Sequence, residues 1–400
     1  MRTIGTYFRV FDLRQNVVAL VFMLTLLAMI PGVASEAPEW IVYNTKNSGL
    51  PDDSVSSITI DLQGNVWIGF ANITSRGEVG GLAKFDGTQW TVYNTENSDL
   101  PYNEIADLLV DAQGNLWIGT FEPTCAFFGG GLAKLDGQTW TIYTAENSEL
   151  PSNDVKALVM DAQGRLWIGV GDHTMSNQLI SGVARFNGAS WTVYTPENSE
   201  LPSQRDARRP SGKAPVSVFA LAIDPQEHLW IGAGDVHNAG VGGLATFDGE
   251  HWTVYTTANS ALPNNCVDVL ATDAQGDLWI GTYPADGSLA SGVAKFDGAQ
   301  WTVYTTENSG LPWNQIRAFA FDALGNVWIG TADEHNAEGG GLAKFDGEQW
   351  TVYTTENSGL PSNHVTDLTF DAQGNLWIGT GSGGVAVYRE GGVMLPDVKE

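Results

Sequence analysis

Four of the six histidines lie where they could take part in chemistry. His173, His237 and His335 occur in segments of unequal length between apolar runs, each with acidic residues nearby, and His364 opens an alternating apolar run. Converging imidazoles and carboxylates can bind a divalent metal or transfer protons. Solvated loop histidines are the alternative, because nothing in the spacing forces these side chains together. HExxH, GxSxG and phosphate-binding glycine motifs are absent, so we assign no catalytic residue.

A second set of candidates lies just before each alternating apolar run. One position there is almost always amide or acid, which predicts a turn-capping role; it comprises Asp53, Asn103, Asn153, Asn265, Asn314 and Asn363. The next position varies, and variation on a constant scaffold favours ligand contact. The ligand-binding candidates at this variable position are Glu104, Asp154, Gln315 and His364. Tyr102, Trp313 and Tyr283 could stack on a sugar as exposed aromatic platforms, with loop packing as the alternative.

One segment is basic in an otherwise acidic chain. Residues 202–215 contain Arg205, Arg208, Arg209 and Lys213 but a single acid, Asp206. Guanidinium groups bind carboxylates and phosphates in pairs, so this insertion could clamp an anionic ligand. A surface loop is the alternative, because proline, glycine and serine are frequent in it.

These candidates are set in a repeat of roughly 50 residues, and such a period indicates stacked structural units. A segment that begins with tryptophan recurs at Trp40, Trp90, Trp140, Trp191, Trp252, Trp301 and Trp350. A second tryptophan, followed by Ile-Gly, recurs at Trp67, Trp117, Trp167, Trp230, Trp279, Trp328 and Trp377. Aromatic residues at strand spacing normally fill a core, so we expect both sets to pack between neighbouring sheets.

Each repeat predicts four short strands. In the first complete unit these are residues 55–61, 66–69, 81–85 and 90–93, separated by an Asp-Leu-Gln-Gly-Asn turn and an Asp-Gly hairpin. Four antiparallel strands per repeat form a propeller blade. The fold class is therefore all-β, a seven-bladed β-propeller.

The two ends of the chain complete the count of blades. Residues 40–43 are a fourth strand without a unit of its own, and the last unit stops after its third strand, residues 384–388. Joining them completes the seventh blade and closes the ring without an exposed edge. In this arrangement the second-to-third and fourth-to-first connections surround one mouth of the channel, where the histidines, the variable residues and the basic insertion all lie.

The first 35 residues have the layout of a secretory signal: three arginines, an apolar run over residues 17–30, and small residues before a cleavage point. An uncleaved anchor is the alternative, although the run is short for a membrane span. We expect a signal peptide at 1–35, the propeller at 36–391, a tail at 392–400, and a secreted or periplasmic protein without a membrane span in its mature part.

Composition limits the partners. The net charge of −27 argues against binding to nucleic acid or to an anionic membrane surface. The two cysteines, Cys125 and Cys266, belong to different repeats, so the fold does not depend on disulfides, and a bridge between them stays an open question. We expect a soluble monomer that binds a carbohydrate or a protein.

The repeat resembles a known family. Residues 360–368 (Leu-Pro-Ser-Asn-His-Val-Thr-Asp-Leu) and 371–380 (Asp-Ala-Gln-Gly-Asn-Leu-Trp-Ile-Gly-Thr) look like the two-component regulator propeller repeat, and the pattern recurs in all seven units. The resemblance implies an extracytoplasmic propeller of the kind found in hybrid histidine kinases, where carbohydrates are thought to be sensed. This sequence contains no kinase or receiver region, so we expect binding rather than direct signalling.

The repeat is also similar to that of streptogramin lyases. That resemblance implies the alternative function, a metal-assisted lyase or hydrolase in which a divalent metal is held by histidines on the same face. We expect the chain to be an exported ligand-binding or interaction propeller, and the lyase is the second hypothesis.

Overall fold

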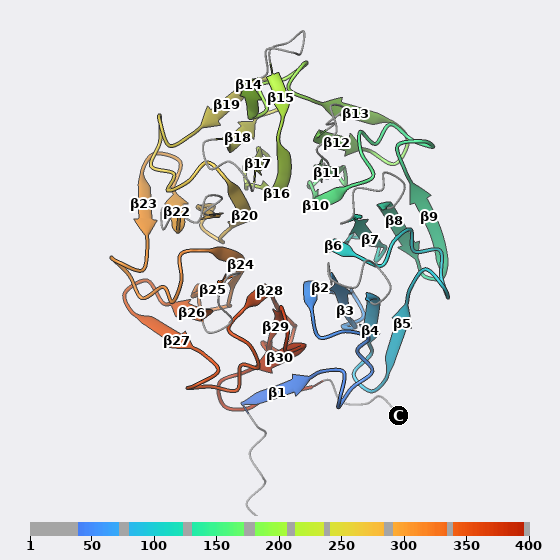
Figure 1. Cartoon of the computed structure of the whole chain (residues 1–400), viewed down its shortest axis with the longest axis vertical. Coiled ribbons are helices and arrows are strands. Elements are labelled where there is room, and N and C mark those ends of the chain that lie inside the picture. Colours follow the sequence, from blue (N-terminus) through green and yellow to red (C-terminus); the bar gives the residue numbers. More distant parts are fainter. Residues whose placement is uncertain are drawn as a thin grey trace, which may run out of the picture.

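A computed structural model shows seven four-stranded antiparallel sheets arranged as blades around a central channel (Figure 1). It describes residues 39–71, 80–122, 130–171, 181–205, 213–235, 241–283, 291–333 and 339–395. The seven-bladed, all-β fold predicted from the repeats is confirmed. Within these ranges there is no helix with the length and hydropathy needed to cross a membrane.

The blades are numbered 1 to 7 in chain order, and each contributes an inner, a second, a third and an outer strand. The inner strands are β2 (Val55–Ile60), β6 (Ile105–Val110), β10 (Val155–Met160), β16 (Ser217–Ile223), β20 (Val267–Thr272), β24 (Ile316–Phe321) and β28 (Val365–Phe370). The second strands are β3 (Val66–Phe70), β7 (Leu116–Thr120), β11 (Leu166–Val170), β17 (Leu229–Gly234), β21 (Leu278–Thr282), β25 (Val327–Ala332) and β29 (Leu376–Thr380). The third strands are β4 (Gly81–Phe85), β8 (Gly131–Asp136), β12 (Gly182–Phe186), β18 (Gly242–Phe247), β22 (Val293–Phe296), β26 (Gly340–Phe345) and β30 (Val385–Tyr388). The outer strands are β5 (Trp90–Tyr93), β9 (Thr139–Tyr143), β13 (Trp191–Tyr194), β19 (Trp252–Tyr255), β23 (Trp301–Tyr304), β27 (Trp350–Tyr353) and β1 (Trp40–Tyr43).

The ring closes where the sequence predicts. β1 pairs antiparallel with β30, with Trp40 opposite Tyr388 and Tyr43 opposite Val385. The first strand of the described chain is thus the outer strand of blade 7, whose other three strands come from the C-terminal end (Figure 1). Non-covalent pairing of the two ends leaves β30 without a free edge.

The turn between the inner and second strands is built around one aspartate in every blade. In blade 1, Asp61 Oδ1 accepts hydrogen bonds from the amides of Gln63 and Asn65, and its Oδ2 accepts one from the Trp67 indole at 2.9 Å. The equivalent aspartate–indole distances in the other blades are 2.9–3.2 Å. The structural role predicted for these aspartates is confirmed, and it extends to orienting the buried tryptophan.

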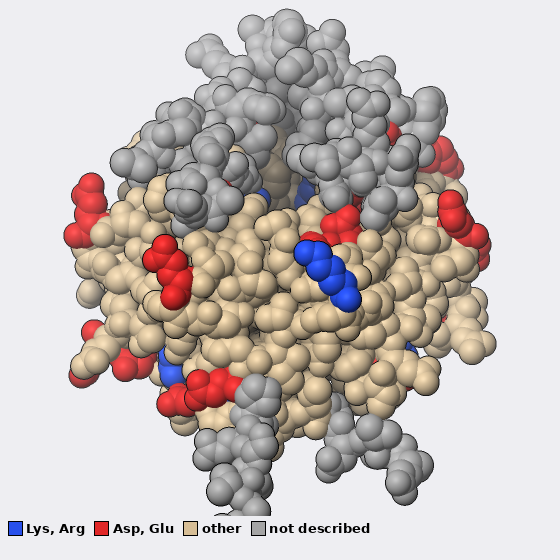
Figure 2. Space-filling view, turned by 60° about the horizontal axis from the view of Figure 1, so that its bottom comes forward, with Lys and Arg blue, Asp and Glu red and all other residues tan. Residues whose placement is uncertain are grey.

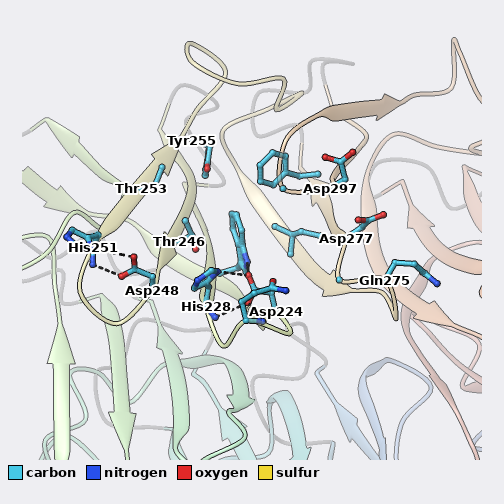
Figure 3. Close-up of a pocket in the computed structure, with 16 residues that line it drawn as sticks. Asp224, His228, Thr246, Asp248, His251, Thr253, Tyr255, Gln275, Asp277 and Asp297 are labelled. Atoms are coloured by element: carbon cyan, nitrogen blue, oxygen red, sulfur yellow. Dashed lines mark hydrogen bonds and ion pairs between the residues drawn. The ribbon is translucent and has the colours of Figure 1, made fainter.

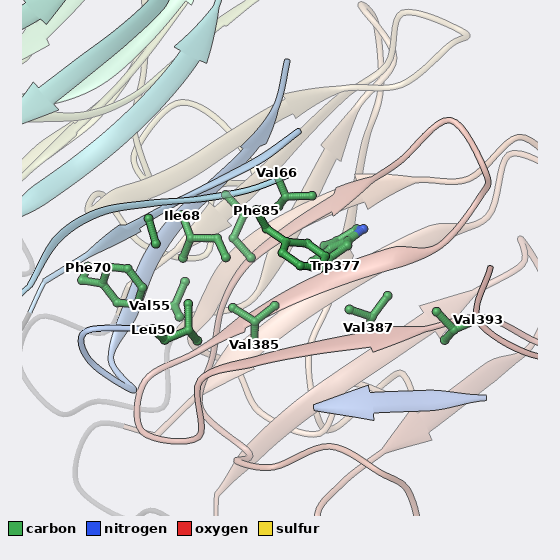
Figure 4. Close-up of a cluster of buried hydrophobic side chains, with 12 residues drawn as sticks. Leu50, Val55, Val66, Ile68, Phe70, Phe85, Trp377, Val385, Val387 and Val393 are labelled. Carbon is green, nitrogen blue, oxygen red and sulfur yellow. The ribbon is translucent and has the colours of Figure 1, made fainter. Parts of the chain in front are cut away.

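The core lies between blades rather than within them. Figure 4 shows the cluster that joins blade 7 to blade 1, in which Trp377 packs against Phe85 and the aliphatic side chains of β2 and β3. The ring of Tyr43 stacks on Trp377 at 6.2 Å between centroids and meets Trp90 edge-on at 5.5 Å. Both tryptophan sets therefore pack between neighbouring sheets, as their spacing predicts.

The two ends of the strands form two different faces. The fourth-to-first connections and the C-terminal ends of the second strands lie on one side, which we call the loop face. The Asp61-type turns and the third-to-fourth hairpins lie on the other, the turn face. The insertion of blade 4 begins and ends as a two-stranded hairpin, β14 (Ser203–Arg205) and β15 (Lys213–Pro215), which the sequence did not predict.

Candidate functional site

The channel wall is formed by one residue from each inner strand, at what we call the channel position. All seven line a single cavity: Ser56, Ala106, Lys156, Phe219, Asp268, Arg317 and Thr366. In every blade the pairing of the inner with the second strand shifts register at this residue, as in a β-bulge. A bulge residue is left out of the ladder and its side chain is re-aimed. The scaffold therefore presents one freely variable side chain per blade to the channel.

Two ion pairs lie in the channel. Arg317 Nη1 is 2.7 Å from Asp268 Oδ2, across blades 6 and 5, and Lys156 Nζ is 2.8 Å from Asp154 Oδ1. Figure 2 shows basic side chains inside the hollow of the molecule, whereas the charged side chains scattered over the outer surface in view are mostly acidic. The Lys156 ammonium also lies 3.7 Å from the centroid of the Phe121 ring. Each of these two basic side chains is therefore paired with a carboxylate.

The channel opens on the loop face into a cavity of about 620 Å³. Its wall is supplied by four consecutive blades, 5, 6, 7 and 1, through Asp268, Arg317, Thr366 and Ser56. We call these four residues the polar arc. The Oγ of Ser56 and the Oγ1 of Thr366 are buried and have no hydrogen-bond partner within the part of the chain that the structure describes. The polar arc thus presents a guanidinium, a carboxylate and two unsatisfied hydroxyls to one space.

Two buried aspartates lie deeper in the channel, one residue beyond the channel position. Asp367 Oδ2 accepts the amide of Ile58 in the next blade at 2.6 Å, and Asp107 Oδ2 accepts that of Leu158 at 2.7 Å. The Ser57 side chain lies in the blade between them and lowers the pKa of both carboxyls, although by less than burial raises it. Each carboxyl thereby ties one inner strand to the next.

Burial raises the pKa of both carboxyls. The pKa of Asp107 rises to about 7, because loss of solvation outweighs the amide hydrogen bond from Leu158, and the nearby charge of Asp367 adds to the effect. The pKa of Asp367 rises to about 6 for the same principal reason. Near neutral pH these groups therefore exchange protons more readily than ordinary aspartates.

The four ligand-binding candidates that vary between blades lie two residues before the channel position, nearer the loop face. We call this the rim position. Glu104 is fully buried and Gln315 nearly so, Asp154 pairs with Lys156, and His364 lines the loop-face cavity. Cys266, also at the rim, is a buried free thiol whose pKa is raised by burial. Of the four candidates, the structure brings His364 to the polar arc.

The constant position before the rim caps the connection between blades. Asn103 Oδ1 accepts the amide of Thr95 at 2.9 Å, and Asp53 and the asparagines of blades 3, 5, 6 and 7 accept the amide eight residues upstream in the same way. The capping role predicted for this position is confirmed.

The aromatic candidates are half-buried rather than exposed: Tyr102, Trp313 and Tyr283 all have intermediate accessibility. The Arg317 guanidinium carbon lies over the ring of Tyr283, 6.0 Å from the ring centroid. Tyr283 therefore packs against one member of the polar arc. Burial, followed by the charges of Glu122 and Glu104, raises the pKa of Tyr102.

The remaining candidates lie outside the described residues. These are His173, His237, His335, Arg208 and Arg209, and for Arg205 the structure describes the backbone alone. Among the described residues, no three His, Cys, Asp or Glu side chains converge so as to hold a metal ion. We therefore derive no chemistry that passes through a metal.

Comparison with known proteins agrees with this architecture. The family model for the two-component regulator propeller matches residues 99–122, 149–172, 261–283, 310–333 and 359–382. Each match spans a rim, an inner strand, its turn and a second strand. No curated protein sequence matches the chain significantly.

Solved structures that share the fold come from different functional settings. The extracellular domain of the proposed hybrid two component system BT3049 from B. thetaiotaomicron is 21% identical, with a TM-score of 0.63 over 90% of this chain and 41% of that one. PorZ, a surface component of the type-IX secretion system of Porphyromonas gingivalis, is 17% identical, with a TM-score of 0.59 over 87% of this chain and 47% of that one. Virginiamycin B lyase from Staphylococcus aureus is 13% identical, with a TM-score of 0.60 over 87% and 98%. This chain spans less than half the length of the first two proteins, and at these identities the likeness shows the fold.

Proposed function

We propose that this chain, which is built from two-component regulator propeller repeats, is an exported protein that binds a neutral carbohydrate at the loop-face mouth of its channel. The signal-like leader over residues 1–35 supports export, as does the extracellular setting of the BT3049 domain. The leader, the propeller and the short tail would be its three parts.

The polar arc is the observation that carries this function. The Arg317–Asp268 pair offers donors beside an acceptor, which suits adjacent sugar hydroxyls. The hydroxyls of Ser56 and Thr366 have no hydrogen-bond partner among the described residues, and buried groups of this kind cost free energy until a partner satisfies them. The cavity of about 620 Å³ falls within the range of small-molecule sites.

A neutral ligand fits the electrostatics better than a charged one. Lys156 and Arg317, the cations that line the channel among the described residues, are each already paired with a carboxylate, so an added ionic group would disturb an existing pair. A buried charge without a partner is costly, whereas a polyol can share the hydrogen bonds of a pair without breaking it.

The function is tested with saccharides of known composition. Glucose, galactose, maltose, cellobiose and glucuronate would be titrated into the purified protein by calorimetry and thermal shift. We expect one or more neutral saccharides to bind and to raise the unfolding temperature. Thr366→Val and Arg317→Met should each weaken that saccharide at least about tenfold, since a lost hydrogen bond to a buried group costs about 1–3 kcal/mol.

The matched controls remove a hydroxyl or a positive charge outside the channel: Thr91→Val on β5, the outer strand of blade 1, and Lys84→Met on β4, its third strand. They should leave affinity within about twofold. Failure of every saccharide to bind, or equal affinity in Thr366→Val and the parent protein, would reject the carbohydrate site.

The metal-assisted lyase is the second candidate, because His364 lines the same cavity. It requires a divalent metal together with His173, His237 or His335. Metal analysis of the purified protein tests it directly: a metal-free preparation whose saccharide binding survives alanine at all four histidines would exclude it.

A further inference from the structure

Five of the seven blades share an internal contact on the turn face. In each, a basic side chain of the third strand lies over the tryptophan of the second strand. The pairs are Lys84–Trp67, Lys134–Trp117, Arg185–Trp167, Lys295–Trp279 and Lys344–Trp328, with the charged group 5.1–5.5 Å from the ring centroid. This geometry is a cation–π contact.

Blade 7 lacks the basic residue and fills its place with another part of the chain. Val387 stands opposite Trp377, and Val393 joins the same apolar cluster (Figure 4). Met394 fixes that segment, because its amide donates to Asn375 Oδ1 at 2.9 Å and its carbonyl accepts from Asn375 Nδ2 at 2.6 Å. In blade 7 the segment that follows β30 is therefore packed into the same cluster as this tryptophan.

Blade 4 also lacks the basic residue, and there the space stays open. Thr246 stands opposite Trp230 in the sheet, and a cavity of about 400 Å³ lies over this position. Trp230, Tyr255 and Phe296 form its aromatic part. Its volume is enough for the end of an extended side chain from another molecule.

The residues at the edge of this blade 4 cavity are mostly acidic. Figure 3 shows the Asp248 hairpin on one side and Asp277 and Asp297 of blade 5 on the other, with Asp224 and His228 between them. None of the described residues that line the cavity is lysine or arginine. Asp277 is paired with Lys295 at 2.6 Å, whereas the partners of the other three carboxylates are neutral donors or histidines. Asp224 Oδ2 lies 2.9 Å from both His228 Nδ1 and Trp230 Nε1, Asp248 Oδ2 lies 3.4 Å from His251 Nδ1, and Asp297 accepts backbone amides. Amide hydrogen bonds, from His251 and from Gln300 respectively, hold the pKa of Asp248 and of Asp297 below the usual range, so both stay ionised.

We propose that the blade 4 cavity binds an alkylammonium or alkylguanidinium group, which takes the place that lysine or arginine occupies over the equivalent tryptophan in five other blades. The chain itself is the template for this site. In blade 5 the Lys295 ammonium lies over Trp279 and 3.9 Å from Asp273 Oδ2, the equivalent of Asp224. The guest would be a basic side chain of a partner polypeptide or a free amine, and the site lies on the face opposite the polar arc.

The test titrates two kinds of probe into the purified protein at about 150 mM salt. The first is acetyl-Gly-Lys-Gly-amide, with acetyl-Gly-norleucine-Gly-amide as its neutral match. The second is n-butylammonium and n-butylguanidinium. We expect the cationic probes to bind with dissociation constants on the order of millimolar, and the norleucine peptide to bind at least about tenfold more weakly.

Thr246→Lys should close the site from within. The variant restores the residue found at this position in four other blades, so it should fold, which its unfolding temperature verifies. We expect it to lose cation binding by about tenfold or more. Thr351→Lys adds the same charge at an exposed position of blade 6 and should change affinity less than about twofold.

Comparison of the lysine peptide with n-butylammonium distinguishes a partner polypeptide from a free amine as the source of the cation. A peptide that binds at least tenfold tighter than butylammonium points to a polypeptide partner, and equal affinities point to a free amine. The proposal is overturned if no cationic probe binds at 20 mM, if the norleucine peptide binds as well as the lysine peptide, or if Thr246→Lys binds as the parent protein does.

Discussion

Asp107 and Asp367 give the channel a titration range that ordinary aspartates lack. Burial raises the pKa of Asp107 from 3.8 to about 7, and that of Asp367 to about 6. The folded chain therefore holds more protons than the unfolded chain between about pH 4 and pH 7. The contribution of these two groups to the free energy of unfolding is therefore fully present below about pH 4. It is lost as the pH rises through their pKa values in the folded state.

Asp107→Asn isolates this effect. The neutral amide should be less stable than the parent at pH 4, because one of the two amide acceptors is lost. It should nevertheless lose less stability between pH 4 and pH 7.5, since the parent forfeits roughly 4 kcal/mol at this residue over that range. Unfolding temperature against pH measures it. Parallel curves for the two proteins would show that Asp107 does not titrate in this range.

Which residue of each inner strand faces the channel could not be derived from alternation alone. Variation between blades predicts ligand contact at the rim position of Glu104 and Gln315, and the structure buries both side chains. The channel wall is formed two residues later, because a bulge shifts the register in every blade. A signal was present: this position holds Ser, Ala, Lys, Phe, Asp, Arg and Thr in turn, which no shared packing role would tolerate.

At the scale of the element, the turns were the most predictable feature of the chain. An aspartate with a glycine three residues later specifies six of the seven turns between inner and second strands, and blade 4 places Glu227 at positive φ there instead. Such local hydrogen bonds need no knowledge of distant residues. The hairpin of β14 and β15 was not predictable, because its two strands are three residues long and lack apolar alternation. Cross-blade contacts such as Asp107 with Leu158 likewise depend on how blades meet, which local sequence does not encode.

The two turn aspartates of one blade should differ in their contribution to stability. Asp61→Ala leaves the indole of Trp67, 5% exposed, without its acceptor and should cost about 2–3 kcal/mol. Asp86→Ala frees amides that water can reach and should cost less than about 1 kcal/mol. Both variants remove one negative charge, so their difference in denaturant midpoint reports the buried indole. Equal midpoints would contradict this role of the turn.

At the scale of the whole molecule, the channel on the loop face and the blade 4 cavity on the turn face differ in charge, which the net charge of the chain does not reveal. The chain carries −27, yet the cations of the channel are paired on the loop-face side, while the blade 4 cavity on the turn face is acidic. The sequence predicted the ring and its closure. It could not predict the blade 4 cavity, since that hollow exists only because Thr246 fails to fill a space defined by two adjacent blades.

Closure by β1 makes the stability of the ring depend on a strand that no covalent connection holds within its blade. Trp40 lies 4.5 Å from Tyr388 and 5.9 Å from Tyr353 between ring centroids, so β1 joins blade 7 to blade 6 as well as completing its own sheet. A chain that begins at Asn44 loses these contacts and exposes the edge of β30. We expect its unfolding temperature to fall by at least about 5 °C and self-association to increase in size-exclusion chromatography.

A synthetic peptide covering residues 38–45 should bind the vacated edge of this shortened chain. Added in trans, it should restore part of the lost stability in proportion to its concentration, because it binds the folded ring and not the unfolded chain. A scrambled peptide of the same composition lacks the register in which Trp40 meets Tyr388 and should have no effect. If the shortened chain unfolds at the temperature of the parent, the pairing of β1 with β30 is dispensable, and the remaining strands of blade 7 must hold the ring closed through blade 1 and blade 6 alone.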